Sequence, residues 1–444
     1  HPVVMAMSFY PKEARPLWDT YSTRAIAHTI DVYNQFAITY PYPTAQSVNG
    51  PVGGMEYPMI TFNGPRPVRG DDGKLTYTER AKNGLIGVVI HEVGHIYFPM
   101  VINSDERQWT WMDEGLNSSL QYQAQKLWDP DFPSRGEPRD IVEYMISEDQ
   151  VPVMTQSDSL LQFGNNAYAK PATALVILRE TVLGRELFDR AFREYSARWA
   201  FKRPTPYDFF RTMEESSGVD LDWFWRGWFY STDHVDISLD GVTAARLAAA
   251  DPEVQARADR ARFAGEPVPT TVTNNRGIET VIQRDPAVRD FYNETDRFTV
   301  TATQRRTAAT AAARADADRL AAQDFTDNIY RFTFTNVGGL VMPVILKLTY
   351  SDGSDETIRI PAEIWRRNSH QVIWQHVSAR TLTGAEIDPL WETADADRAN
   401  NAYPRRIEQQ TLRLSGERPT GENRMRDSDV EVSPDSTATR SSRR

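Results

Sequence analysis

The sequence contains no cysteine among its 444 residues. This absence excludes disulfide bonds, thiolate zinc sites, iron–sulfur clusters and cysteine catalysis, so any bound metal has to be held by histidine and carboxylate side chains. Apolar runs long enough to span a bilayer are also absent, which excludes a membrane channel. Basic residues are outnumbered, with 50 Lys and Arg against 61 Asp and Glu, and the net charge of −11 argues against nucleic acid as a partner.

The composition that remains is that of a globular protein with several domains. Charged residues make up 25% of the chain and hydrophobic residues 40%, which excludes disordered and collagen-like classes. At about 150 residues per domain, the length predicts about three domains. The chain begins at His1, with neither an initiator methionine nor a signal segment. We therefore expect it to be a piece of a longer protein.

Helical patterns dominate the first half of the sequence. Apolar residues at spacings of three and four predict a helix within residues 13–36, and a second long helical pattern covers residues 76–98. Between them, Asn49-Gly50 and Gly64-Pro65 predict turns that join short extended segments. We interpret residues 1–236 as one mainly helical domain.

The second half changes composition twice. Residues 237–325 are rich in Ala and Arg and contain few large apolar side chains, so we expect a linker or a peripheral helical insertion. From Ile329 onward apolar and polar residues alternate, which predicts a β-rich domain over residues 326–415. Residues 416–444 lack apolar periodicity, and we expect a disordered tail there.

The strongest chemical signal is the segment His91-Glu92-Val93-Gly94-His95 inside the second predicted helix. Residues i and i+4 share one helix face, so both imidazoles can bind one ion while Glu92 lies beside it. A catalytic zinc needs a third protein ligand and an open position for water. Glu114 lies 19 residues after His95, on the next predicted helix. The pattern therefore predicts one zinc ion held by His91, His95 and Glu114, with Glu92 as general base.

These motifs together resemble the gluzincin aminopeptidases of peptidase family M1, which includes aminopeptidase N and leukotriene A hydrolase. Two further segments carry the resemblance. The segment Gly53-Gly54-Met55-Glu56-Tyr57 is similar to the G-A-M-E-N exopeptidase motif of the family, and Tyr168-Ala169-Lys170-Pro171 is similar to its Y-x-K-G segment. The chain departs from the family pattern at four positions, which are Gly54 for Ala, Tyr57 for Asn, Asp113 for Asn and Pro171 for Gly.

The resemblance implies a multidomain α+β fold. It consists of a thermolysin-like, mainly α-helical catalytic domain followed by a β-sandwich-like domain, without the N-terminal β-domain of the family. It also implies that Tyr168 faces the zinc and stabilises the oxyanion, and that Glu56 binds the free α-ammonium of the substrate beside Gly53, Gly54 and Met55. The implied activity is that of a zinc-dependent aminopeptidase acting on peptides with a free N-terminus. By the same resemblance, we expect a periplasmic or secreted location.

Two other functions fit the same residues. The scaffold could serve an endopeptidase or an epoxide-opening hydrolase, and substitution of Glu56 distinguishes these from an aminopeptidase. A binding module is the third hypothesis, with a structural metal and a binding surface on the β-rich domain formed by Trp365, Trp374, Asp388, Asp395 and Asp397. Turnover of an aminoacyl anilide that is lost with a chelator and restored with zinc would exclude the binding module.

Overall fold

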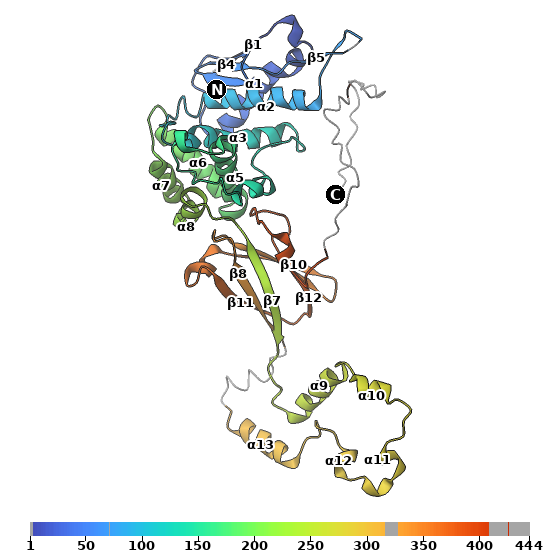
Figure 1. The fold of residues 1–444 in the computed structure, drawn as a ribbon. Coiled ribbons are helices and arrows are strands. Elements are labelled where there is room, and N and C mark those ends of the chain that lie inside the picture. The colour runs from blue at the N-terminus through green and yellow to red at the C-terminus, as the bar shows by residue number, and fades with distance from the viewer. Residues whose placement is uncertain (1–2, 71, 316–326, 408–424, 426–444) are drawn as a thin grey trace.

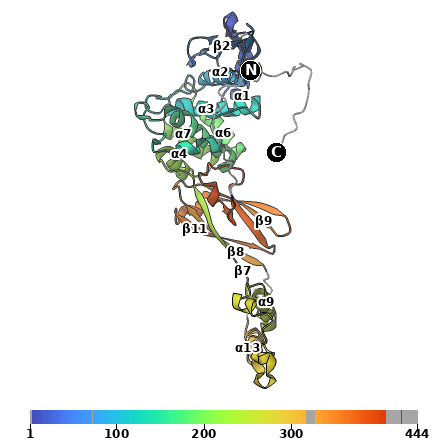
Figure 2. The ribbon, with the colours of Figure 1, turned by 45° about the vertical axis from the view of Figure 1, so that its right-hand side comes forward.

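The computed structural model describes residues 3–70, 72–315 and 327–407 together with Met425. Its mixed α and β structure agrees with the expected α+β class. In Figure 1 three parts follow one another along the long axis: helices with a small sheet, two antiparallel sheets, and a group of short helices. The turned view in Figure 2 shows the same order. Within the described residues, every helix is too short or too polar to cross a membrane.

A four-stranded sheet opens the first part. Its strand order is β1-β2-β4-β3, with β1, β2 and β4 parallel and β3 antiparallel to β4. Strand β3 is therefore an edge strand, and it contacts helix α2. The strands are β1 (Met5–Phe9), β2 (Thr44–Asn49), β3 (Gly54–Tyr57) and β4 (Ile60–Asn63), followed by the small hairpin of β5 (Val68–Arg69) and β6 (Leu75–Thr76).

Helices fill the rest of this part, as the periodicity predicts. The first predicted helix begins only after Pro16, since a proline is tolerated at the start of a helix but not within it. The second begins at Glu79 and is capped by Thr78, whose hydroxyl accepts a hydrogen bond from the Ala81 amide. The helices are α1 (Leu17–Phe36), α2 (Glu79–His95), α3 (Thr110–Trp128), α4 (Val142–Met145), the π-helical η4 (Gly164–Ala169), α5 (Lys170–Ile177), the π-helical η5 (Leu178–Val182), α6 (Arg185–Trp199), α7 (Pro206–Ser217), α8 (Asp222–Trp225) and the π-helical η6 (Arg226–Tyr230).

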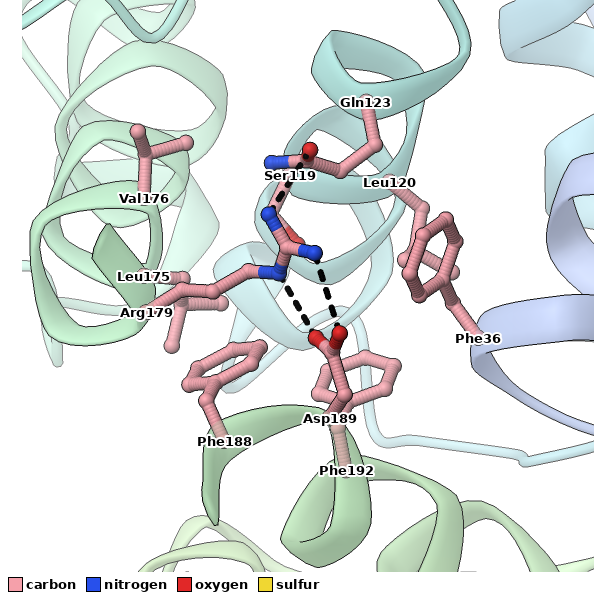
Figure 3. A pocket seen from close by; sticks show the side chains of 10 residues that line it. All are labelled: Phe36, Ser119, Leu120, Gln123, Leu175, Val176, Arg179, Phe188, Asp189 and Phe192. Carbon is pink, nitrogen blue, oxygen red and sulfur yellow. Dashed lines mark hydrogen bonds and ion pairs between the residues drawn. The ribbon is translucent and has the colours of Figure 1, made fainter. Parts of the chain in front are cut away.

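A buried ion pair ties three of these elements together. Arg179 of η5 donates two hydrogen bonds to the carboxylate of Asp189 on α6, at 2.6 and 3.0 Å, and a third to Gln123 on α3 at 3.1 Å (Figure 3). The rings of Phe36, Phe188 and Phe192 surround the pair. A buried guanidinium is tolerated because these partners satisfy its donors, and their positions fix α3 relative to α6.

The second part consists of two antiparallel sheets with the orders β10-β9-β12-β13 and β11-β8-β7. Their facing side chains, such as Phe332, Phe334, Leu346 and Leu348, are buried in the hydrophobic core. The predicted alternation from Ile329 is present, and a turn at residues 351–354 joins β9 to β10. The strands are β7 (Ile237–Ala245), β8 (Asn328–Asn336), β9 (Val344–Tyr350), β10 (Asp355–Ile360), β11 (Gln371–Ser378), β12 (Leu382–Ile387) and β13 (Ala402–Tyr403).

The structure differs from the predicted linker at its start. Residues 237–245 form β7, which pairs with β8 from Ile237 opposite Asn336 to Ala245 opposite Ile329. The physical reason is that Ile237 and Leu239 are buried in the core of the sheets. The prediction of a linker relied on the composition of residues 237–325, which is dominated by the Ala and Arg residues after this strand. The β-rich part therefore includes residues assigned to the linker from sequence.

The remaining residues of the predicted linker form an arm between β7 and β8. Arg305 pairs with Glu253 at 2.6 Å, and Arg260 pairs with Asp296 at 2.6 Å. None of the arm's α-helices buries a residue, so the arm has no hydrophobic core of its own. These helices are α9 (Pro252–Ala264), α10 (Thr270–Asn274), α11 (Val281–Arg284), α12 (Phe291–Glu294) and α13 (Ala302–Ala313).

An aromatic seam joins the first two parts. Phe224, Trp225, Trp228 and Phe229 are buried in the core. The Trp228 indole donates to Met342 Sδ at 3.5 Å. The binding surface considered for the β-rich part is not present as such, because Trp365, Asp388 and Asp395 are buried. The predicted tail at residues 416–444 lies outside the described residues except for Met425.

Candidate active site

Helix α2 presents His91, Glu92 and His95 from its last turn. The helix packs its apolar face, including Val89, Ile90 and Val93, into the core. His95 is 1% exposed and Glu92 is 5% exposed, so the histidine motif lies at the inner end of the helix and not on the surface.

Helix α3 brings Glu114 to the same point. Glu114 Oε2 lies 3.1 Å from His91 Nε2 and 3.2 Å from His95 Nε2, and the two Nε2 atoms lie 3.0 Å apart. Ligand atoms of a tetrahedral zinc ion with bonds of about 2.0 Å are about 3.3 Å apart. The three predicted ligands thus form a set whose spacing fits a small divalent ion.

The ring nitrogens that face away from this point are both held by acceptors. His95 Nδ1 lies 2.8 Å from the Phe98 carbonyl oxygen and 2.9 Å from Asp113 Oδ1. His91 Nδ1 lies 2.9 Å from Gln121 Oε1, whose amide is oriented by donating to the Gly87 carbonyl. Both Nδ1 atoms therefore carry the proton, which leaves the lone pair of each Nε2 atom free for a metal.

The electrostatics of the three side chains favour one positive charge at their centre. Burial lowers the pKa of His91 and keeps it neutral. Burial also opposes a charge on His95, but Asp113 and Glu114 outweigh it and raise the pKa of His95 well above its usual value. Burial acts against the charge on Glu114 as well, yet the two imidazoles lower its pKa. A divalent cation suits this donor set better than a proton on His95 does.

A buried network fixes the distance between α2 and α3. The Tyr33 hydroxyl donates to Asn117 Oδ1 at 2.7 Å, and Asn117 Nδ2 donates to the His91 carbonyl at 2.8 Å. A Cβ atom on Gly94 would lie 2.1 Å from Asn117 Oδ1, so only glycine permits this approach of the helices. Sequence reasoning missed Asn117 and Gln121. Their signal was the spacing of three and seven residues after Glu114, which places all three on one face of α3.

Glu92 is buried beside the ligand set. Burial is the main cause that raises its pKa to about 8, and the nearby Glu56 and Glu114 add to the effect, although His95 opposes it. Among the described residues, Glu92 Oε2 has no hydrogen-bond partner. The carboxyl group is therefore free to exchange a proton with a reacting water.

Strand β3 places Glu56 next to Glu92 and His95, with one ligand atom of each within 4.8 Å of the others. A Cβ atom on Gly54 would lie 2.1 Å from Glu92 Oε1, so the backbone of β3 runs against the Glu92 carboxylate. Met55 is exposed, and Gly53 has open space around it. The structure thus brings Glu56 and Gly54 to the site, while Gly53 and Met55 lie on its exposed side.

Tyr168 reaches the site from η4. Its hydroxyl donates to Glu114 Oε1 at 2.5 Å, and its ring stacks on the His91 ring with centroids 5.6 Å apart. Burial and the nearby Glu114 raise its pKa, so the hydroxyl keeps its proton. Tyr168 is therefore a neutral hydrogen-bond donor at the edge of the ligand set.

Comparison with known proteins identifies this part of the chain. Residues 21–228 match the model of the peptidase family M1 domain. Probable aminopeptidase 1 of Sulfurisphaera tokodaii is 23% identical over 239 residues, which are 48% of this chain and 29% of that protein. Human (Homo sapiens) glutamyl aminopeptidase is 22% identical over 244 residues, which are 50% of this chain and 24% of that protein.

A solved structure shares the fold. The crystal structure of Legionella pneumophila aminopeptidase A in complex with aspartic acid superposes with a TM-score of 0.54 at 12% identity, and the match covers 88% of this chain and 36% of that chain. The chain thus spans about a third or less of the length of the relatives cited above. With the ligand geometry already in place, the match to residues 21–228 shows that this part of the chain is similar to the peptidase family M1 domain and supports an aminopeptidase relationship.

Proposed function

We propose that this chain is a zinc-dependent aminopeptidase that hydrolyses the N-terminal peptide bond of peptides. The observation that carries the proposal is the group of acids beside the ligand set: Glu92 and Glu56 both lie next to His95. One carboxylate can serve the reacting water and the other can bind the substrate's ammonium group. An endopeptidase does not bind a free ammonium group at this point and would not need the second carboxylate.

His91, His95 and Glu114 would hold the zinc ion through two imidazole nitrogens and one carboxylate oxygen. When bound, zinc polarises the scissile carbonyl and lowers the pKa of a bound water towards 7. Glu92 accepts the proton of the attacking water and passes it to the leaving amine. Glu92 Oε2 has no hydrogen-bond partner among the described residues, so it is available for both proton transfers.

Tyr168 supplies a donor for the negative charge that develops on the carbonyl oxygen. In the structure its proton goes to Glu114 Oε1, so a small rotation of the side chain is needed to reach the substrate. Because the hydroxyl is neutral, it can donate to an oxyanion without introducing a charge into the resting site.

Glu56 defines where the substrate begins. A carboxylate next to Glu92 pairs with the α-ammonium of the first residue and brings only the first peptide bond to the reacting water. Gly53 has open space around it and Met55 is exposed on the edge strand β3, so both stay accessible to a peptide. This arrangement is the reason for assigning exopeptidase activity.

The test uses the purified chain, a panel of fluorogenic aminoacyl substrates and a parallel metal analysis. We expect about one zinc per chain, turnover that a chelator abolishes and zinc restores, and a strong loss of activity in Glu56→Gln. Peptides with a blocked N-terminus should not be cleaved. Cleavage of blocked peptides that is unchanged in Glu56→Gln would show an endopeptidase instead, and a chain that binds no zinc would refute the site.

A further inference from the structure

The groups of the site lie in a definite order. Glu56 lies beside Glu92 and His95, with one ligand atom of each within 4.8 Å of the others. At the other end of the ligand set, Tyr168 donates a hydrogen bond to Glu114 and stacks on His91. Beyond Tyr168 comes a cation, because the guanidinium carbon of Arg135 lies 5.6 Å from the centroid of the Tyr168 ring. The line therefore has a carboxylate at one end and a guanidinium at the other.

Arg135 lacks a carboxylate partner in the part of the chain that the structure describes, and its side chain is exposed. The nearest acid in its own loop, Glu137, is engaged elsewhere, since it pairs with Lys126 at 2.8 Å. A guanidinium above an aromatic ring is oriented by that ring while its N–H groups stay free to bind an anion.

The loop that carries Arg135 is anchored directly after it. Gly136 has a φ of +117°, which strongly favours glycine, and a Cβ atom there would lie 3.0 Å from the Tyr122 ring. Tyr122 belongs to α3, the helix that carries Glu114. The position of Arg135 is therefore set by the same helix that supplies a metal ligand.

We propose that Arg135 binds a carboxylate of the substrate on the leaving-group side of the scissile bond. The inference rests on the proposed function, because Glu56 must take the ammonium for the remainder of the peptide to run past Tyr168. The carboxylate comes either from the C-terminus of a short peptide or from an acidic side chain. In both cases the guanidinium forms charge-assisted hydrogen bonds, and the enzyme prefers peptides that carry a negative charge shortly after the bond it cleaves.

The test compares four substrates with the same first residue. They are a dipeptide with a free carboxylate, its C-terminal amide, the amide of the corresponding peptide with Asp in second place, and an aminoacyl anilide without a carboxylate. We expect a KM about 10-fold lower for at least one of the carboxylate substrates than for the plain amide, with similar kcat, as one partly exposed charged contact provides. The free-carboxylate and Asp substrates identify the source of the charge.

Substitution then assigns the preference to Arg135. In Arg135→Gln the ratio of the KM values falls to near one, and in Arg135→Lys part of the preference remains. The matched control is Arg139→Gln, which removes the same charge four residues later from an exposed arginine beside Asp140 and keeps the preference. Because an exposed contact is screened, the preference of the unchanged enzyme also weakens at high salt.

Equilibrium binding separates this inference from the proposed function. The same peptides are titrated by calorimetry into the zinc-loaded Glu92→Gln variant with and without Arg135→Gln, which requires no turnover. An equal Kd for carboxylate and amide peptides, or a carboxylate preference that survives Arg135→Gln, overturns the role of Arg135. Absence of anilide turnover with intact carboxylate-selective binding instead refutes the proposed reaction alone.

Discussion

The carboxyl group of Glu92 has a strongly raised pKa in the metal-free protein. Its folded-state pKa of about 8 lies above the ordinary 4.5, mainly because the side chain is buried. At a pH between these two pKa values, the folded protein holds a proton at Glu92 that the unfolded chain has released. The metal-free protein therefore loses stability as the pH rises through this window.

This linkage predicts that Glu92→Gln stabilises the metal-free protein at pH 8.5 and has little effect at pH 4.5 or below. Glutamine has the shape of the protonated acid but cannot ionise, so the gain is on the order of 2 kcal/mol at the higher pH. Melting temperatures at the two pH values measure it. Glu143→Gln, at an exposed position on α4, is the control. An equal shift at both pH values would contradict the assignment of a buried proton.

The contact between Gly54 and Glu92 gives a second prediction at the residue scale. A methyl group on Gly54 would lie 2.1 Å from Glu92 Oε1, whereas one on Gly53 would meet nothing within 4 Å. Gly54→Ala should displace the carboxyl group and reduce kcat by about 10-fold or more, with zinc content unchanged. Gly53→Ala should cause a smaller loss. An equal kcat in the two variants would show that the backbone of β3 shifts to accommodate the methyl group and leaves Glu92 in place.

Residue identity and spacing were sufficient to predict that His91, His95 and Glu114 lie together, but not the groups that orient them. His91, His95 and Glu114 follow a pattern that depends only on helix geometry. Asn117 and Gln121 act through the contact between two helices, which no local periodicity encodes. The pairing of Gly115 with Pro171 is similar: a Cβ atom on Gly115 would lie 2.6 Å from Pro171 Cγ, a close fit that only the folded structure displays.

At the scale of elements, the site depends on the close approach of α2 to α1 and α3. Gly94→Ala would place a Cβ atom 2.1 Å from Asn117 Oδ1 and 2.4 Å from the Tyr33 hydroxyl. We expect a loss of about 2 kcal/mol in the free energy of unfolding, as for other overpacked cores, measured by the melting temperature of the metal-free protein.

The same helix offers the matched control. Gly84 is exposed on α2, and a Cβ atom there would meet only Pro65 Cγ at 3.9 Å. Gly84→Ala should therefore stabilise the protein by up to about 1 kcal/mol through helix propensity. If both variants were destabilised alike, the cause would be the helix backbone and not the contact with Asn117.

Helices and strands were predictable where the apolar pattern repeats over many residues. The helices within residues 13–36 and 76–98 and the strands after Ile329 show clear periods, and the structure contains them. Strand β7 was missed because its buried residues occupy only its first half, while the exposed second half reads like the arm that follows. A strand that is completed by a partner some 80 residues later leaves no local sign of its pairing.

For the whole molecule, the arm between β7 and β8 is separate from the site. In Figure 1 it lies at the end of the molecule opposite to α2 and α3. Deletion of residues 248–326 leaves residues 246, 247, 327 and 328 between the paired residues Ala245 and Ile329. Antiparallel strands readily accept a connection of this length. We expect an unchanged kcat/KM and a melting temperature that is not lowered, since the arm's α-helices bury nothing. A large loss of activity would reveal a coupling between arm and site.

The β7–β8 pairing also determines what can be attached to this protein. Ala245 faces Ile329 at the tip of the hairpin, and opposed residues of antiparallel strands lie about 5 Å apart. The chain therefore leaves and re-enters the sheet at nearly one point, whatever its length in between. Any folded module whose own termini are neighbours could replace the arm without pulling the strands apart. The tip is thus a natural position for a fused reporter or affinity domain, far from His91, His95 and Glu114.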